Sequence, residues 1–254
     1  NEFLFVQQAL CQGPINAVYD VILAGSMDLD EPSLGGISNS DPGRNAKSKG
    51  AMRIDVHYGT GAVADAIMTA NDGARQDAKF PNIAYATGAF RLDRDNPQFN
   101  QIPDMQFFIE GRKIRKVVGG VLSNTYEYSN NPSWCLLDYL LDNVSGKGLT
   151  LDEVDLPSFE AAAAICDTVV MPNAIMGGKV WQPIDGVRNV TTRALPLYEC
   201  NIVVDTEKPL RTNVQSILST MGDARLVWSQ GKYKLLLQYP ETNAAIALAG
   251  TLSD

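Results

Sequence analysis

The first half of the chain is dominated by short apolar runs rich in β-branched and aromatic residues. Such runs, when Gly, Pro, Asn and Asp separate them, are typical of strands joined by turns. They predict strands over residues 3–11, 17–23, 51–58, 82–92 and 105–110. Gly13-Pro14 divides the first two, and Glu110-Gly111 is predicted to turn the chain into another strand over residues 112–118.

The run over residues 51–58 has the clearest alternation of apolar and polar positions. Its apolar positions are Met52, Ile54 and Val56, and its polar positions are Arg53, Asp55 and His57. Because side chains alternate between the faces of a strand, this pattern predicts a half-buried strand. A short helix is predicted over residues 61–70.

The second half shows a helical period instead. It predicts helices near residues 132–142, 158–169 and 210–221. Asn131 is a good cap for the first, and Pro132 suits the first helical position. The third carries the cleanest apolar stripe, which consists of Leu210, Val214, Ile217, Leu218 and Met221.

Strand patterns flank this third helix. A strand is predicted over residues 197–204, and a hairpin over residues 225–229 and 232–237, joined by Gln230-Gly231. The order strand, helix, strand, strand predicts a small α/β domain in which the helix covers one face of the sheet. The whole chain is therefore predicted to be α+β and β-rich.

Three parts are predicted along the chain. Residues 1–120 form a β-rich domain, interrupted by a Gly-, Pro- and Ser-rich loop insertion over residues 24–50. Residues 121–240 form the α/β domain. Residues 241–254 begin a following domain or supply a return strand.

Composition narrows the functional classes. The chain has 254 residues, 45% of them hydrophobic, and a formal net charge of −8 from 21 basic and 29 acidic residues. An acidic surface repels phosphate backbones, and we therefore expect no sequence-specific nucleic-acid binding. The same charge is compatible with the wall of a duct through which DNA passes without binding. The longest apolar runs are too short for a membrane span.

The N-terminus shows no signal-peptide pattern, and we expect none. The chain opens without Met in the strand-like run Phe3-Leu4-Phe5-Val6, which predicts a piece of a longer protein. The four cysteines, Cys11, Cys135, Cys166 and Cys200, form no CxxC motif and have apolar neighbours. They are predicted to be buried free thiols in a protein that folds in a reducing cytoplasm.

Residues for catalysis or metal binding are sparse. His57 is the one histidine of the sequence, and no nucleophile motif accompanies it, so it is predicted to be an exposed or hydrogen-bonded structural residue. The acidic run Asp28-Leu29-Asp30-Glu31 lacks the glycine and the later glutamate of a calcium loop. We therefore predict no catalytic, cofactor-binding or metal-binding residues, and no cofactor.

Two glycine-rich segments are candidates for phosphate binding. Gly59-Thr60-Gly61 precedes the predicted short helix, but it lacks the third glycine of a dinucleotide motif and a Walker lysine. Residues 35–50 contain Arg44, Lys47 and Lys49 without Gly-Lys-Ser/Thr. The first is predicted to be a turn and the second a loop.

The three tryptophans could instead form a sugar-binding platform. Trp134 and Trp228 fall at core-facing positions of a predicted helix and strand, so both are predicted to pack in the core. Trp181 stands in a Gly- and Pro-rich segment and is the candidate for exposed ligand contact.

Four stretches together resemble the tail-tip or host-specificity proteins of lambda-like siphophages (the protein J type), within the baseplate-hub family of tailed phages. They are residues 3–15 with Gly13-Pro14-Ile15; residues 102–114 with Glu110-Gly111-Arg112-Lys113; residues 128–141 with Asn131-Pro132-Ser133-Trp134, followed by the helix over 158–167; and residues 198–232 with Leu226-Val227-Trp228-Ser229. The third is the most specific. The poorest match is residues 24–51.

The resemblance implies a structural hub subunit of a phage or prophage tail and not an enzyme. It implies barrel-like β domains of the baseplate-hub type with a small α/β domain attached. The full-length chain would form a homotrimeric ring at the distal end of the tail tube, in the virion, after assembly in the cytoplasm of the bacterial host. Its partners would be the distal tail protein, the tape-measure protein, and tail-fibre or receptor-binding proteins.

Two alternatives stay open. A tail-associated glycan hydrolase needs two carboxylates across a cleft, and the sequence does not single out a pair. A glycan-binding module needs an exposed aromatic shelf, for which Trp181 is the candidate. For the hub, residues 24–50 and 171–196 are the segments expected to reach a neighbouring subunit, and this piece alone is expected to be monomeric.

Overall fold

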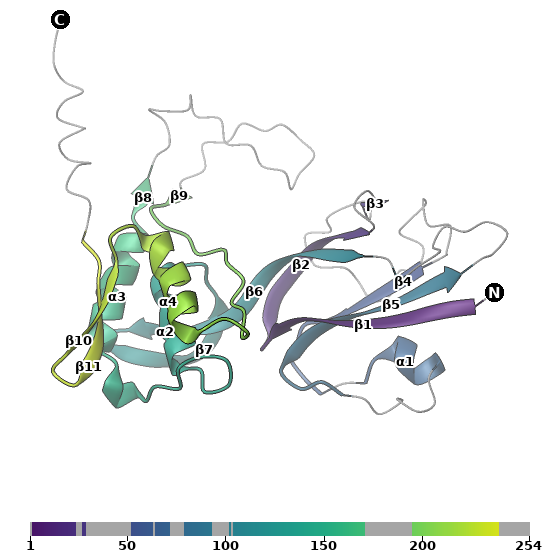
Figure 1. Cartoon of the computed structure of the whole chain (residues 1–254), viewed down its shortest axis with the longest axis horizontal. Coiled ribbons are helices and arrows are strands. Elements are labelled where there is room, and N and C mark those ends of the chain that lie inside the picture. The colour runs from purple at the N-terminus through teal and green to yellow at the C-terminus, as the bar shows by residue number, and fades with distance from the viewer. Residues whose placement is uncertain are drawn as a thin grey trace, which may run out of the picture. The chain divides into compact units, whose positions relative to one another are not determined.

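The computed structural model describes residues 2–23, 27–28, 52–62, 64–71, 79–92, 102, 104–170 and 195–238. The described residues divide into an N-terminal unit up to Lys113 and a C-terminal unit from Ile114 onward (Figure 1). The predicted segment 241–254, and all of the predicted loop 24–50 except residues 27–28, lie outside the described residues. So do residues 171–194.

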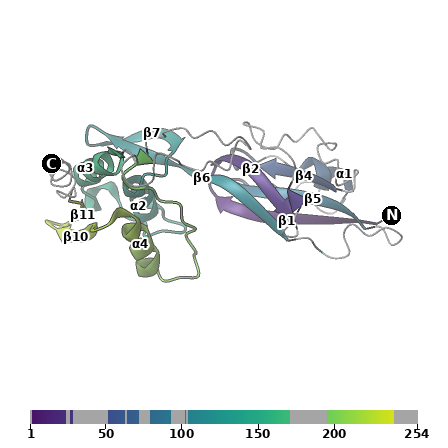
Figure 2. The same ribbon diagram turned by 90° about the horizontal axis from the view of Figure 1, so that it is seen from above.

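The N-terminal unit is built from antiparallel strands in two sheets. In the first, β1 (Glu2–Gln12), β5 (Ile83–Leu92) and β4 (Met52–His57) lie in the order β1-β5-β4 (Figures 1 and 2). The second has the order β3-β2-β6-β7, with β3 (Met27–Asp28), β2 (Ile15–Leu23), β6 (Met105–Val118) and β7 (Val121–Tyr128), and its last strand, β7, belongs to the C-terminal unit. The long strand β6 passes from this unit into the C-terminal one.

One apolar core serves both sheets of the N-terminal unit. Its buried members come from β2, β4, β5 and β6: Ile15, Val18, Val21, Ile54, Val56, Ala84, Ala86, Phe90 and Met105. Because side chains alternate along a strand, each sheet turns one face toward this core. The short helix α1 (Ala66–Asn71) lies against the first sheet, in contact with β5 (Figure 1).

The prediction of a half-buried β4 is wrong. Val56 is 1% exposed on the core face, but Asp55 is also buried, at 2%. Asp55 pairs with Thr87 of β5, whose side chain lies on the side of α1. The segment that leads into α1 therefore covers the face that the polar pattern assigned to solvent.

The predicted turn at Glu110-Gly111 is also wrong. β6 continues through both residues, because β2 pairs with it on either side of this point. The chain turns instead at Gly119-Gly120, where φ is 61° and 77°. Two consecutive left-handed residues are what a two-residue hairpin turn requires, and glycine adopts that conformation without strain.

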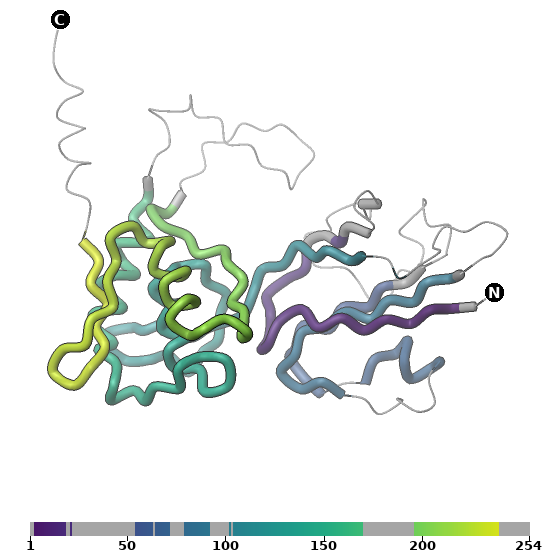
Figure 3. Tube along the Cα trace, viewed as in Figure 1, coloured from purple at the N-terminus to yellow at the C-terminus, as the bar shows by residue number. Residues whose placement is uncertain are grey.

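The C-terminal unit packs three helices with a hairpin. The helices are α2 (Pro132–Leu141), α3 (Leu156–Cys166) and α4 (Leu210–Leu218), the last continued by a 3-10 turn, η3 (Ser219–Met221). The hairpin pairs β10 (Arg225–Ser229) with β11 (Lys232–Leu236), as Figure 3 shows in yellow. A 3-10 turn, η1 (Leu151–Glu153), precedes α3, and β8 (Val169–Val170) pairs with β9 (Leu195–Pro196).

The predicted strand over residues 197–204 is wrong, because β9 ends at Pro196 and no strand follows it before α4. Its amides have separate partners: the Tyr198 amide donates to the Cys166 carbonyl and the Cys200 amide to the Asn130 carbonyl. Scattered bonds of this kind hold an irregular segment and do not form a ladder.

The helix α4 does not cover the hairpin as predicted. It packs against α2, where Asn213 Nδ2 donates to Tyr139 Oη at 3.0 Å. The helix that contacts β11 is α3, and Ser158 Oγ accepts the Leu235 amide there at 3.1 Å.

A glutamate fixes the β6–β7 turn to α3. The two carboxylate oxygens of Glu160 accept the amides of Gly119 and Gly120, each at 2.7 Å. A carboxylate that accepts two amides makes charge-assisted bonds, which are stronger than neutral ones. Glu160 therefore joins the hairpin to the helical part of the C-terminal unit.

The predicted α+β, strand-rich class is confirmed. Over the described residues the strands form open sheets and do not close into a barrel.

Asn131 joins α2 to α3. Its Oδ1 accepts the Ser133 amide at 3.0 Å, as a helix cap does, and its Nδ2 donates to the Ala163 carbonyl at 2.9 Å. Ser133 Oγ donates to the Phe159 carbonyl at 2.7 Å. Asn131 is only 3% exposed, so no solvent replaces these partners if the side chain is removed.

We expect Asn131→Ala to destabilise the C-terminal unit by about 1–3 kcal/mol, because it removes the helix cap and one of the two hydrogen bonds that the Ala163 carbonyl accepts, the other coming from the Asp167 amide. Urea unfolding monitored by tryptophan fluorescence measures this, since all three tryptophans follow residue 113. The control is Asn124→Ala on the exposed side of β7, which should change stability by less than about 0.5 kcal/mol. Equal effects of the two substitutions would contradict the assignment.

Candidate functional site

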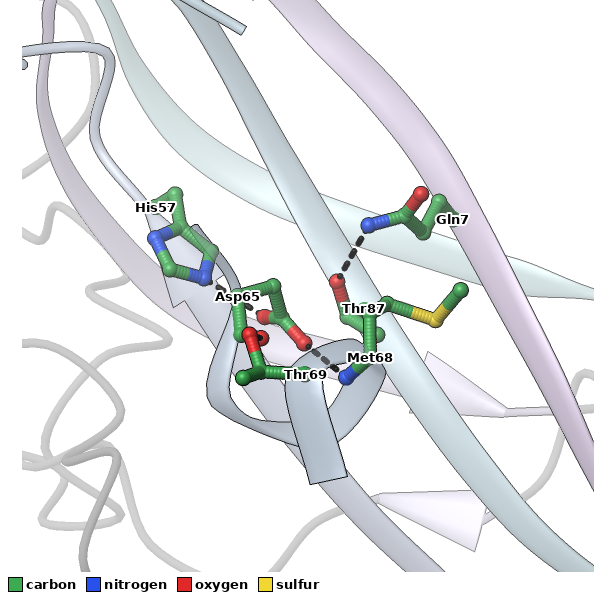
Figure 4. Close-up of polar contacts among 6 residues, drawn as sticks. All are labelled: Gln7, His57, Asp65, Met68, Thr69 and Thr87. Carbon is green, nitrogen blue, oxygen red and sulfur yellow. Dashed lines mark hydrogen bonds and ion pairs between the residues drawn. The ribbon is translucent and has the colours of Figure 1, made fainter. Parts of the chain in front are cut away.

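A buried carboxylate stands where the segment after β4 enters α1. The side chain of Asp65 is 1% exposed, and its Oδ1 accepts the Met68 amide at 2.9 Å. Its Oδ2 lies 2.6 Å from Nε2 of His57 (Figure 4). Asp65 therefore caps α1 and binds the last residue of β4.

The same carboxylate reaches the central strand of the sheet. The Thr87 side chain, on β5, makes a hydrogen bond to Asp65. Gln7 of β1 in turn donates from Nε2 to Thr87 Oγ1 at 3.3 Å (Figure 4). The chain of contacts Gln7, Thr87, Asp65, His57 thus crosses all three strands of the first sheet.

Aromatic rings pack beside this network. The His57 ring stacks on Tyr85, with centroids 4.4 Å apart, and Phe80 meets Tyr85 edge-on at 5.1 Å. Burial, and then the nearby charge of Asp65, raise the pKa of Tyr85 above its usual value. A phenol with a raised pKa stays neutral at physiological pH.

The pKa of Asp65 is the balance of opposing effects. Burial alone would raise it, but the hydrogen bonds from His57, the Met68 amide and Thr87 outweigh burial, so the pKa lies below the ordinary 3.8. A carboxyl with a lowered folded pKa stabilises the fold above its unfolded pKa and loses that contribution as the pH falls through the folded value.

The arrangement differs from that of a nucleophilic site. Nucleophilic catalysis pairs a hydroxyl with a base and orients the base with a third group. Here His57 Nε2 and the Thr87 hydroxyl both bind Asp65, so the carboxylate lies between the imidazole and the hydroxyl. The geometry fits a link between α1 and the sheet, and His57 is hydrogen-bonded as the sequence predicted.

The other candidate residues fall in several places. Gly59 has a φ of 78°, and a Cβ there would lie 2.8 Å from the Gly13 carbonyl oxygen, so Gly59-Thr60-Gly61 is a tight bend against the connection between β1 and β2. Trp134 is 5% exposed, which confirms its core position. Trp181 lies outside the described residues. Of the run Asp28-Leu29-Asp30-Glu31, only the backbone of Asp28 is described.

Trp228 is not in the core, contrary to prediction, because 57% of it is exposed. It shares a face of the hairpin with the buried Leu235, but it pairs with Tyr233 next to the Gln230-Gly231 turn, whereas Leu235 pairs with Leu226 further from the turn. The two rings meet edge-on at 4.7 Å. The alternation of apolar and polar residues predicted burial for Trp228, but its position next to the turn is the sequence feature that indicates exposure.

The edge strand β7 presents large apolar side chains at the surface. Among the described residues, β7 is the last strand of its sheet, and its residues Val121 and Tyr126 are 68% and 52% exposed. An edge strand can pair with a strand of another chain.

No group of three or more metal-ligating side chains is present in the described ranges. The described helices include none with the length and hydropathy needed to cross a bilayer.

Comparison with known proteins gives one informative match. The chain is 25% identical over 165 residues to "Baseplate hub protein pb3" of Escherichia phage T5. The match covers 65% of this chain and 17% of that protein, so the chain spans a minor part of its relative's length. No family model matches. The similarity supports a relation to phage tail and baseplate proteins, and it does not single out the protein J type.

At neutral pH we expect Asp65→Asn to destabilise the N-terminal unit by about 1–3 kcal/mol, because an amide replaces a charge-assisted acceptor. The difference from wild type should shrink as the pH falls below 3.8, where the native carboxylate takes up its proton. Urea unfolding by circular dichroism at pH 7 and at about pH 3 measures both effects. The matched control is the exposed Asp104→Asn, and a difference independent of pH would contradict the network.

Proposed function

We propose that this chain is a structural part of a phage or prophage tail tip or baseplate hub. The observation that carries the proposal is the similarity to the T5 baseplate hub protein over 165 residues. The described fold is compatible with this role. Buried hydrogen bonds fix its helices to one another and to a sheet, while edge strands and large apolar side chains remain exposed for contact with other proteins.

In this proposal the full-length chain assembles as a homotrimer at the distal end of the tail tube. It joins the tube to the distal tail protein, the tape-measure protein, and tail-fibre or receptor-binding proteins. The complex forms in the host cytoplasm and is carried in the virion. A cyclic ring needs two different contact faces per subunit, and exposed edge strands such as β7 provide one kind of face. No catalytic step and no cofactor are part of this function.

The direct test is the location of the chain in particles. Antibodies against it should label one end of the tail in purified virions by immunogold electron microscopy, and its peptides should appear in the virion proteome. The control is an antibody against the major tail-tube protein, which should label the whole tube. Absence of the chain from washed particles, while it is abundant in the lysate, would refute the proposal.

A glycan-binding module is the second candidate, and the exposed Trp228–Tyr233 pair is the observation that favours it. Trp228→Ala separates the two readings. If Trp228 is a hub contact, the wild-type chain gives no glycan-array signal, and the variant is incorporated into fewer particles. If Trp228 belongs to a glycan-binding module, the wild-type chain gives a signal that falls at least about tenfold in the variant, since loss of an aromatic platform costs on the order of 1–3 kcal/mol. The matched control is Val203→Ser, which removes apolar surface from a residue that is 91% exposed.

A further inference from the structure

Two cysteines that are distant in the sequence converge in the C-terminal unit. Cys135 lies in α2, and its Sγ lies 3.7 Å from the Ser129 carbonyl oxygen. The next residue, Asn130, accepts the amide of Cys200 at 2.7 Å. Both residues are therefore anchored to the same two-residue stretch before α2, and both side chains pack in the same apolar core, where each thiol shifts the pKa of the other.

The surroundings make the two thiols unequal. The neighbouring Cys135 thiol lowers the pKa of Cys200 against the opposing effect of burial, and the Thr220 hydroxyl adds to the lowering. The pKa of Cys135 is raised, first by Cys200 and then by burial. Because the thiolate is the attacking form in thiol–disulfide exchange, Cys200 is suited to react first and Cys135 to complete the exchange.

We propose that Cys135 and Cys200 are a redox site that closes to an intramolecular disulfide when a small-molecule disulfide is supplied. The Cys200 thiolate attacks one sulfur of that oxidant, forms a mixed disulfide and releases one thiol. Cys135 then loses its proton and attacks Cys200 Sγ, which forms the internal S–S bond and releases the second thiol. Two protons and two electrons pass to the oxidant, which is reduced to two thiols.

The segment that carries Cys200 gives the bond a structural effect. Residues 197–204 lack a strand ladder, and Ile202 and Val203 are 37% and 91% exposed, whereas Cys200 itself is only 8% exposed. The oxidant therefore reaches Cys200 when this irregular segment, held by scattered hydrogen bonds, opens locally. A disulfide would tie this irregular segment covalently to α2. Because the closed loop is long, the bond would lower the conformational entropy of the unfolded chain more than a bond across a short loop would.

The test is to incubate the native, reduced chain with oxidised glutathione, unfold it, alkylate it, and map its peptides by mass spectrometry. We expect a Cys135–Cys200 cross-linked peptide, while Cys11 and Cys166 are recovered in alkylated form. The oxidised chain should also have a higher thermal midpoint than the reduced chain, and Cys200→Ser should abolish that difference. Cys11→Ser, in the N-terminal unit, is the matched control and should keep it.

Three results would overturn the proposal. The first is alkylation of all four thiols after oxidation. The second is a cross-link from either residue to Cys166, which is also in this core. The third is a glutathione adduct that persists on Cys200 without resolution by Cys135. If Cys200→Ser does not fold, the peptide map of the wild-type chain alone decides the question.

Discussion

The fold depends on buried polar side chains that cap a helix and at the same time bind a second element. Asp65 does this for α1 and the first sheet, and Asn131 for α2 and α3. A buried polar group without partners costs more than a typical hydrogen bond contributes, so each such residue admits only one arrangement of its neighbours. The apolar cores supply cohesion, while these residues specify how the elements dock.

Several large apolar side chains also remain exposed outside the two cores. The two glycines of the β6–β7 turn are held by Glu160, so the hairpin is fixed although side chains of β7 are exposed. Trp228 stands at the tip of another hairpin in the same way. A rigid support under exposed strands and aromatic side chains suits a protein whose work is to contact other proteins, which agrees with the similarity to a baseplate hub protein.

Much of the local structure was predictable because its signals are local. Asn131-Pro132 marks the start of α2, and the amide geometry at Asn131 is the one that such a cap requires. The hairpin at Gln230-Gly231 also follows from its turn residues, and Gln230 adopts a positive φ of 54°. These elements depend on side chains within a few positions of one another.

The failures have a common cause, which is that a distant partner decided the outcome. Glu110-Gly111 is a plausible turn, but pairing with β2 keeps the chain extended. Residues 197–204 have the composition of a strand, yet their amides bind Asn130 and Cys166, so no ladder forms. The network around Asp65 joins four segments, and the convergence of Cys135 and Cys200 joins two more. No spacing in the sequence reveals either.

We propose that this chain serves assembly and not chemistry, and electron cryomicroscopy of the intact tail tip is the measurement that decides. We expect density for three copies of the chain around the tail axis, with the exposed strand β7 or the Trp228 hairpin buried against another virion protein. A tip in which these surfaces all face solvent, or a tip without the chain, would contradict it.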